Sequence, residues 1–176
     1  MNKKLKLEEL NRVSVQEYKS IKKKPIVVVL DNIRSLHNVG SFFRTCDAFA
    51  VEKLILTGIT ATPPHKEIRK TALGASESVD WVYEKNCLDV IAKYKKLNYQ
   101  ALAIEQTRNS IPLQDFICNE NPILLVFGNE VEGVTQQVIN ECENSIEIPQ
   151  YGTKHSFNVS VSAGIVIWHI NQQLAQ

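Results

Sequence analysis

Residues 26–30 read Ile-Val-Val-Val-Leu, an unbroken apolar run that is mostly β-branched. A strand with one face in water alternates apolar and polar residues, whereas a strand covered by helices on both faces is apolar throughout. The run therefore predicts a central strand of a parallel sheet that has helices on both faces. Residues 22–25, just before it, mark the start of the folded body, because a proline at position 25 disfavours helix in the residue that precedes it.

Further strand and helix candidates alternate along the chain after this run. The strand candidates are short and rich in Val, Ile, Leu or aromatic residues, while the helix candidates repeat apolar residues at helical spacing. The strands are expected at residues 51–58, 80–84, 99–105, 122–128 and 144–149, and the helices at residues 39–49, 67–73, 87–97, 135–142 and 159–174. This alternation predicts an α/β fold with a mainly parallel sheet.

The last helix candidate, residues 159–174, leaves few polar positions. Apolar side chains such as Val161, Val166 and Ile167 point to different sides of a helix, so the pattern predicts burial on most sides. Such a helix must be covered. It either lies deep in the domain or supplies a dimer interface.

The first 24 residues differ in charge from the rest of the chain. They hold eight basic and three acidic side chains, a net charge of +5, whereas the whole chain carries +1. Apolar residues recur at helical spacing over residues 5–22, so we expect one basic helix there. We divide the chain into this arm, residues 1–24, and a body, residues 25–176. A basic arm suits contact with phosphates; a lysine-rich helix that is merely solvated is the alternative.

The composition excludes several classes of protein. A chain of 176 residues, 44% hydrophobic and 22% charged, is typical of one globular domain with a short appendage. No apolar run approaches the roughly 18–20 residues of a membrane-spanning helix, and the basic start lacks the apolar run of a secretory signal. Four scattered cysteines, Cys46, Cys87, Cys118 and Cys142, indicate reduced thiols in a cytoplasmic protein and no metal site.

Three of the expected strand-to-helix loops are rich in small and polar residues. They are DNIRSLHNVG at 31–40, FGNEVEG at 127–133 and IPQYGTKHSFNVS at 148–160. In open α/β sheets, ligands bind beyond the carboxyl ends of the strands, where such loops lie. None of them contains GxGxxG, GxxxxGK[ST] or GxSxG, which excludes the dinucleotide fingerprint, the P-loop and the hydrolase nucleophile elbow. The histidines lack metal-ligand spacing, and His169 in the apolar helix is interpreted as structural.

Taken together, the three loops resemble the motifs of the SpoU (TrmH-like) family of SPOUT RNA ribose 2′-O-methyltransferases. The resemblance covers residues 26–174. It departs from the family at Phe157, where a leucine is usual, and at Gly164, within a run of small residues. The matching residues are Asn38, Gly40 and Arg44 in the first motif, Val126, Phe127, Gly128, Asn129, Glu130 and Gly133 in the second, and Ile148, Pro149, Gly152, Ser156, Phe157, Asn158, Val159, Ser160, Ser162 and Ala163 in the third.

The resemblance implies a C-terminal trefoil knot in the α/β domain, with S-adenosylmethionine bound in a bent form in the knot as methyl donor. It also implies a homodimer, which would cover the apolar final helix. Glycines in the loops would let the backbone approach the cofactor closely. The cofactor-binding residues are expected to be Phe127, Gly128, Asn129, Gly133, Ile148, Gly152, Phe157, Asn158 and Ser160.

The family's reaction assigns the leading catalytic role to Arg44. A guanidinium stays protonated, so it is better suited to holding a phosphate and stabilising the developing alkoxide than to acting as a simple base. The proton acceptor stays open between the phosphate and a transiently deprotonated Arg44, and so does the subunit whose pocket Arg44 serves. Asn38 is expected to orient Arg44, while Glu130, Ser156 and Asn158 position the substrate and loops.

The expected partner is RNA, and no membrane is involved. The loop and helix over residues 31–49 are closer to the tRNA ribose methylases, which favours tRNA. An rRNA ribose methyltransferase is the alternative, although the arm is too short for the additional RNA-binding domain that those relatives often carry. A second alternative is a non-catalytic RNA-binding protein on the same fold. The phosphate-contacting candidates are Lys22, Lys23, Lys24, Arg34, Arg69 and Lys70.

Overall fold

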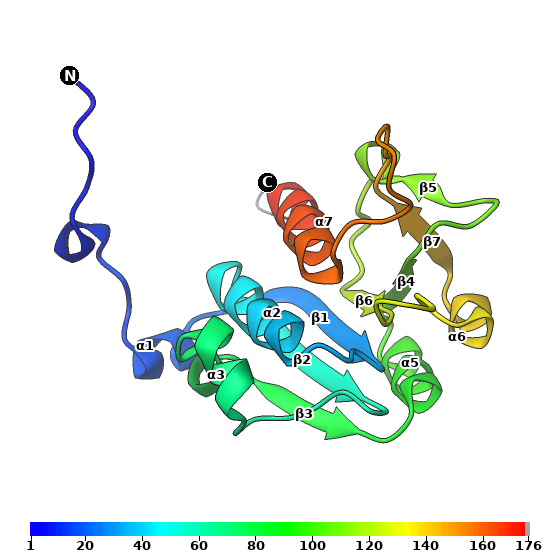
Figure 1. Cartoon of the computed structure of the whole chain (residues 1–176), viewed down its shortest axis with the longest axis horizontal. Coiled ribbons are helices and arrows are strands. Elements are labelled where there is room, and N and C mark those ends of the chain that lie inside the picture. The colour runs from blue at the N-terminus through cyan, green and yellow to red at the C-terminus, as the bar shows by residue number, and fades with distance from the viewer. Residues whose placement is uncertain (175–176) are drawn as a thin grey trace.

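The computed structural model describes residues 1–174, with the side chain of Leu7 excepted. Within these residues, seven strands form one sheet in the order β3-β2-β1-β6-β4-β7-β5, and all the neighbouring strands pair in parallel (Figure 1). The strands are β1 (Lys24–Asp31), β2 (Val51–Thr57), β3 (Trp81–Glu84), β4 (Gln100–Ile104), β5 (Ile111–Pro112), β6 (Ile123–Phe127) and β7 (Asn144–Glu147). The predicted α/β fold with a mainly parallel sheet is confirmed.

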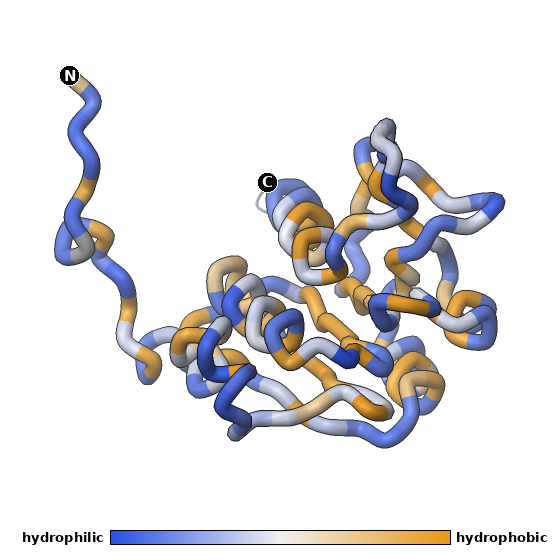
Figure 2. Tube along the Cα trace, viewed as in Figure 1, coloured by the Kyte–Doolittle hydropathy of each residue, from blue (hydrophilic) through white to orange (hydrophobic). Residues whose placement is uncertain are grey.

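Helices cover both faces of the sheet, as the apolar run of β1 predicts. Ile26, Val28 and Leu30 pack into a core with one set of helices, whereas Val27 and Val29 pack on the other face. Figure 2 shows the strands as an apolar centre. The first face carries α2 (Leu36–Ala48), α3 (Lys66–Ala72), α4 (Ala75–Ser78) and α7 (Val159–Gln173), and the second carries α5 (Cys87–Lys96) and α6 (Gln136–Glu141).

Each predicted strand and each predicted helix of the body is present, to within a few residues at its ends. Three short elements escaped the sequence pattern: β5, the single turn α4 and the 3₁₀ turn η2 (Leu113–Asp115). Elements of two to four residues are too short to display a period of 2 or 3.6, so periodicity could not reveal them.

The prediction of one helix over residues 5–22 is wrong. The structure has a 3₁₀ turn, η1 (Leu7–Leu10), and a separate short helix, α1 (Val15–Ser20). Asn11 adopts a left-handed conformation with φ of 46°, which ends the first turn. Ser14 and Glu17 then form a capping box that starts a new helix. The residues that end one turn and start the next therefore interrupt the helix that the apolar spacing predicts.

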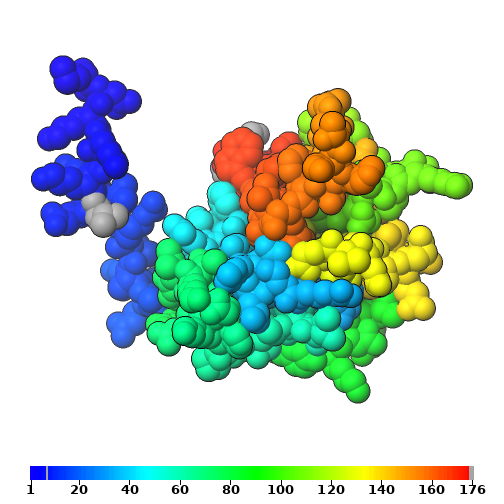
Figure 3. All heavy atoms as spheres, in the orientation of Figure 1, coloured from blue at the N-terminus to red at the C-terminus, as the bar shows by residue number. Residues whose placement is uncertain are grey.

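Tyr18 attaches α1 to the body. Its ring is buried, its hydroxyl donates to the Cys46 carbonyl oxygen at 3.3 Å, and burial raises its pKa. The Lys23 ammonium lies 3.1 Å from the centre of the same ring, a cation–π contact. The residues before α1 stand away from the body (Figure 3). The arm therefore has a docked part and a free part.

The final helix, α7, is buried on one side only. Ala163, Val166, Ile167 and Ile170 are buried in the core, whereas Trp168 is 53% exposed. The expectation of burial on most sides is therefore wrong for the single chain, because nothing in the described residues covers the opposite side of α7. No helix in the described part of the chain is both long and apolar enough to cross a membrane.

The strand order determines where the loops meet. β6 lies between β1 and β4, and β7 lies beside β4. Carboxyl ends of parallel strands share one edge of the sheet, so the segments that follow β1, β4, β6 and β7 are adjacent there. Three of these four segments are the loops that the sequence singled out.

Candidate active site

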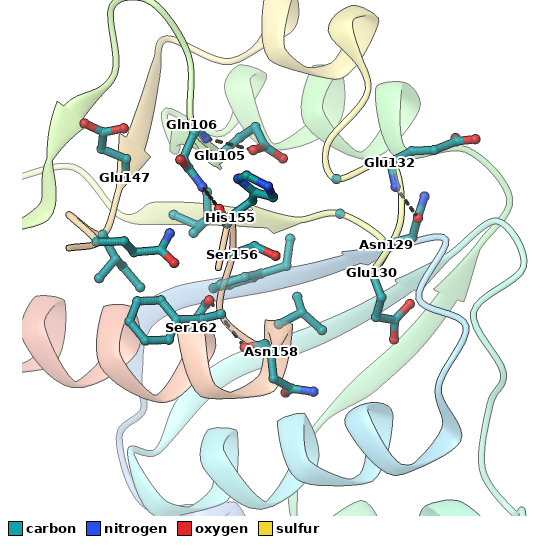
Figure 4. Close-up of a pocket in the computed structure, with 18 of the residues that line it drawn as sticks. Glu105, Gln106, Asn129, Glu130, Glu132, Glu147, His155, Ser156, Asn158 and Ser162 are labelled. Atoms are coloured by element: carbon teal, nitrogen blue, oxygen red, sulfur yellow. Dashed lines mark hydrogen bonds between the residues drawn. The ribbon is translucent and has the colours of Figure 1, made fainter. Parts of the chain in front are cut away.

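A cavity of about 510 Å³ opens where the segments that follow β4, β6 and β7 meet (Figure 4). This volume lies in the range of small-molecule sites. Phe127, Ile148 and Phe157 supply apolar surface, and Phe127 is held by an edge-to-face contact with Phe42, with ring centres 5.1 Å apart. The predicted site residues that line the cavity are Phe127, Gly128, Asn129, Glu130, Gly133, Ile148, Ser156, Phe157 and Asn158.

The loop between β6 and α6 is tightly folded. The Asn129 side-chain oxygen accepts from the N–H groups of Val131 and Glu132, both at 2.9 Å, and the Gly133 N–H donates to the Asn129 carbonyl oxygen at 3.0 Å. A Cβ atom on Gly128 would lie 2.1 Å from the Gly133 backbone. Gly133 itself has φ of +67°. Both positions therefore require glycine.

A hydrogen-bond network joins the three loops. The Asn38 side-chain amide, at the start of α2, donates to Glu130 Oε1 at 2.8 Å. Its oxygen accepts from the Asn158 amide at 3.1 Å and from the Ser160 hydroxyl at 3.4 Å. One side chain from each motif thus meets at the edge of the cavity. No hydrogen bond joins Asn38 to the Arg44 side chain among the described residues, and the expectation that Asn38 orients Arg44 stays a prediction.

Glu130 also holds the loop after β1. Its carboxylate accepts from the backbone N–H groups of Arg34 and Ser35, each at 3.1 Å. Burial alone would raise its pKa, but the hydrogen bonds from Asn38 and from the two N–H groups outweigh this effect and leave the pKa below its usual value. Glu130 therefore stays ionised, and it lies where the N-terminal end of α2 favours a negative charge.

Arg44 lies apart from the cavity. It is on α2, six residues after Asn38, and it borders a separate depression together with Lys70, Gly164 and Trp168. It is exposed and is not among the residues that line the first cavity. Within one chain, the structure does not bring the predicted guanidinium to the predicted cofactor site.

Two of the predicted cofactor residues lie outside the cavity lining. Gly152 is exposed near the tip of the loop between β7 and α7. Ser160 is in the first turn of α7, where its hydroxyl contacts Asn158 Oδ1 at 2.6 Å. Ser160 therefore reaches the site through Asn158.

The predicted phosphate contacts fall into two groups. Lys22 is exposed, whereas Lys23 is half-buried on Tyr18 and the half-buried Lys24 reaches the Leu174 carbonyl oxygen at 3.4 Å. In the body, Arg34, Arg69 and Lys70 are exposed, and Lys70 pairs with Glu67 at 2.8 Å. Arg34 alone of the six is tied to the cavity rim, through its backbone contact with Glu130.

Comparison of the sequence with models of protein families shows which family the chain belongs to. The sequence model of the SpoU rRNA Methylase family matches residues 25–168. The chain belongs to the SpoU family. The resemblance predicted from the three loops is thereby confirmed.

Several SpoU relatives are similar over most of this chain. A protein of Aquifex aeolicus named tRNA (guanosine(18)-2′-O)-methyltransferase is 30% identical over 158 residues, which are 86% of this chain and 71% of that protein. A 23S rRNA (guanosine-2′-O-)-methyltransferase of Neisseria meningitidis is 28% identical over 93% of this chain and 65% of its own length.

Solved SpoU-type structures agree with the fold. The A. aeolicus TrmH/SpoU tRNA modifying enzyme matches with a TM-score of 0.80 and 27% identity, over 90% of this chain and 80% of that one. An AdoMet-bound rRNA methyltransferase from Sinorhizobium meliloti also has a TM-score of 0.80, with 25% identity over 89% of this chain and 60% of that one. At the level of the SpoU family, the predicted enzyme class and methyl donor are confirmed.

The SpoU motifs do not account for the whole cavity. Residues directly after β4 also line it, among them Glu105 and Gln106, and so does His155. The sequence reasoning missed Glu105 and Gln106 because they belong to none of the three loops, and it missed His155 because that residue lies in the third loop but at none of the motif positions. The expectation that ligands bind beyond the carboxyl ends of all the strands, applied to the strand predicted at residues 99–105, could have found Glu105 and Gln106.

Proposed function

We propose that this chain is an S-adenosylmethionine-dependent methyltransferase that methylates a ribose 2′-hydroxyl in RNA, with tRNA as its substrate. The observation that carries the proposal is the junction of the three SpoU motifs through Glu130, Asn38 and Asn158 at the edge of one cavity. A chain that retained only the fold would have no need of this network.

The cavity fits the methyl donor. Phe127, Ile148 and Phe157 offer apolar surface for an adenine and a ribose, while Gly128 and Gly133 leave backbone groups accessible. Its lining contains glutamates and neither lysine nor arginine, which suits a ligand with sulfonium and ammonium groups. S-adenosylmethionine supplies a methyl group on its sulfonium. Asn129 and Asn158 complete the pocket, with Gly152 and Ser160 at its margin.

The trefoil knot belongs to the proposal, with α7 threaded through a loop of the chain. The sheet order around β6, β4 and β7 and the likeness to solved SpoU-type structures support it. Threading would fasten the loop before α7, which bears Ser156 and Asn158, against the loop after β6.

The reaction needs Arg44, which we place at the cavity of a second copy of the chain. Two observations support a homodimer of this kind. Arg44 does not line the cavity of its own chain, and its neighbours on that surface include the exposed Trp168 of the uncovered side of α7. Arg44 would hold a phosphate near the reactive ribose and stabilise the alkoxide that develops there. Glu130 and Asn38 join the loop after β6 to the loop after β1 at the edge of the cavity. Ser156 would position the substrate.

RNA contacts would come from the arm, residues 1–24, and from the body, residues 25–176. Lys22, Lys23 and Lys24 belong to the arm, and Arg34, Arg69 and Lys70 lie on the exposed surface of the body. Buried or half-buried thiols throughout the body accord with a cytoplasmic location.

Transfer of a tritiated methyl group to bulk tRNA or bulk rRNA tests the function directly. The proposal expects label in the tRNA, and digestion to nucleosides should place it on a ribose. Label in the rRNA alone would favour the second candidate, a ribosomal-RNA ribose methyltransferase, which the similarity to the Neisseria relative supports. No transfer to either RNA, with the protein folded, would leave a non-catalytic RNA-binding protein.

A further inference from the structure

Two adjacent residues after β4 reach the two loops that enclose the cavity. The Glu105 carboxylate accepts the Val134 N–H at 2.9 Å through Oε2 and the Gln106 N–H at 2.8 Å through Oε1. The Gln106 side-chain amide donates to the His155 carbonyl oxygen at 2.8 Å (Figure 4). Val134 ends the loop that follows β6, and His155 lies in the loop that precedes α7.

The fit around Glu105 is close. A Cβ atom on Gly133 would lie 2.1 Å from Glu105 Oε2, so the glycine leaves the space that the carboxylate occupies. Two N–H groups approach two different oxygens of Glu105. A glutamine could accept only one of them, and its NH₂ group would face the other N–H donor. The position therefore requires a carboxylate with two acceptor oxygens.

We infer that Glu105 and Gln106 are positioning residues that fix the shape of the cofactor pocket, Glu105 through the loop 128–134 and Gln106 through the loop 148–158. The inference rests on the proposed function, because the cavity they shape is taken to hold S-adenosylmethionine. It assigns a role to a fourth segment of the site, which the three SpoU motifs do not include.

Calorimetry with S-adenosylmethionine on the full chain tests the inference. Glu105→Gln should weaken binding about tenfold, because it removes a hydrogen bond to a charged group and opposes two donors. Glu132→Gln is the matched control. It removes one negative charge from the lining of the same cavity, but the Glu132 carboxylate has no hydrogen-bond partner among the described residues, so the control isolates the effect of charge. Amide exchange at Val134 should accelerate in Glu105→Gln and not in Glu132→Gln.

Gln106→Ala provides an independent test on the other loop. It should weaken cofactor binding about threefold, since it removes one hydrogen bond between uncharged groups. Asn109→Ala, in the same turn and without a side-chain hydrogen bond among the described residues, should leave the affinity unchanged. In Glu105→Gln and Gln106→Ala the affinity for RNA should stay close to that of the wild type, and both proteins should stay folded at the temperature of the titration.

The outcomes separate the two levels of the proposal. If the wild type binds S-adenosylmethionine and Glu105→Gln binds as tightly as Glu132→Gln, the positioning role of Glu105 is overturned while the proposed function stands. A loss of cofactor affinity that is matched by an equal loss of RNA affinity would reduce Glu105 to a structural residue. If the wild type takes up no S-adenosylmethionine, the proposed function itself fails. Should Glu105→Gln fail to fold, equal binding by Gln106→Ala and Asn109→Ala would still overturn the inference.

Discussion

The cofactor cavity and the surface around Arg44 differ in how completely one chain builds them. At the cavity, Asn38, Glu130 and Asn158 are more than 90 residues apart in two of their three pairings, yet direct hydrogen bonds join them. On the other surface, the Arg44 side chain has no hydrogen bond or ion pair among the described residues, and the neighbouring Trp168 is half exposed. A rigid network fixes the first region, whereas the second is an uncovered face. In the proposed function, one chain would hold the methyl donor alone and would need a second copy for catalysis.

Replacing Arg44 should have the largest effect on the reaction. Arg44→Ala should lower methyl transfer by about 10²–10³-fold or more, because the charge that develops on the ribose oxygen loses its main stabilising group. S-adenosylmethionine binding, measured by calorimetry, should not change, since Arg44 does not line the cavity. Normal turnover in this variant would transfer the catalytic role to another residue.

Mixed dimers would identify the subunit that Arg44 serves. Gly128→Val should distort the loop 128–134 and prevent cofactor binding, because the valine Cβ would clash with the Gly133 backbone. Each variant alone should be inactive. In a mixed dimer with Arg44→Ala, one intact site is restored only if Arg44 acts on the cavity of the other copy. Mixtures that stay inactive would show that Arg44 serves its own chain.

Disrupting the uncovered side of α7 should have the next largest effect. Trp168→Glu places a charge where a partner is expected, so sedimentation should detect monomers and methyl transfer should fall by about tenfold or more. Folding should be preserved, because Trp168 is 53% exposed. Leu97→Glu is the matched control, since Leu97 is 57% exposed at the end of α5, on the other face of the sheet. A dimer that survives Trp168→Glu would contradict the proposed interface.

Glu130→Gln weakens the network within the cavity and should have an intermediate effect, about a tenfold loss of methyl transfer. Because hydrogen bonds lower the folded-state pKa of Glu130, its carboxylate stabilises the fold above its unfolded-state pKa of about 4.3. That contribution is lost as the pH falls through the lower folded-state value.

Thermal unfolding of Glu130→Gln and the wild type from pH 7 to pH 3 measures this contribution. Glu130→Gln should have the lower midpoint at pH 7, and the difference should shrink as the pH falls below about 4.3. Glu132→Gln, on the same loop, is the control at pH 7, because it removes one negative charge without removing a hydrogen bond among the described residues. A midpoint difference for Glu130→Gln that grows at low pH would contradict the assigned sign.

The same contrast between regions explains how far the sequence could lead. The run at residues 26–30 indicated a sheet covered on both faces, because burial on both faces imposes an apolar residue at every position. The three loops were singled out because polar residues at the ends of parallel strands meet at one edge, and the resemblance to the SpoU motifs named Asn38, Glu130 and Asn158 within them. Both rules apply within a single chain, so they succeed for the sheet and for the cavity, which one chain builds alone.

The features that the sequence missed depend on tertiary contacts or on competing local signals. Glu105 and Gln106 look like ordinary polar residues after a strand, and only the folded structure shows which loops they reach. The position of Arg44 could not be derived, since helical spacing places it on α2 without saying which cavity it faces. The break in the arm was visible in principle, because Ser14 and Glu17 have the spacing of a capping box.

Neutralising lysines of the arm should have the smallest effect. Lys22 is exposed and available for a phosphate, whereas Lys23 contacts the Tyr18 ring and Lys24 the Leu174 carbonyl oxygen. Lys22→Ala should therefore weaken RNA binding a few-fold and lower the slope of log affinity against log salt by about 0.7–0.9, the loss of one phosphate contact. Lys23→Ala should change the slope less and the thermal stability more. Titrations of the two variants between 50 and 200 mM salt, a range of about fourfold over which such slopes are resolved, compare them directly. Equal slopes in Lys22→Ala and the wild type would show that Lys22 makes no phosphate contact.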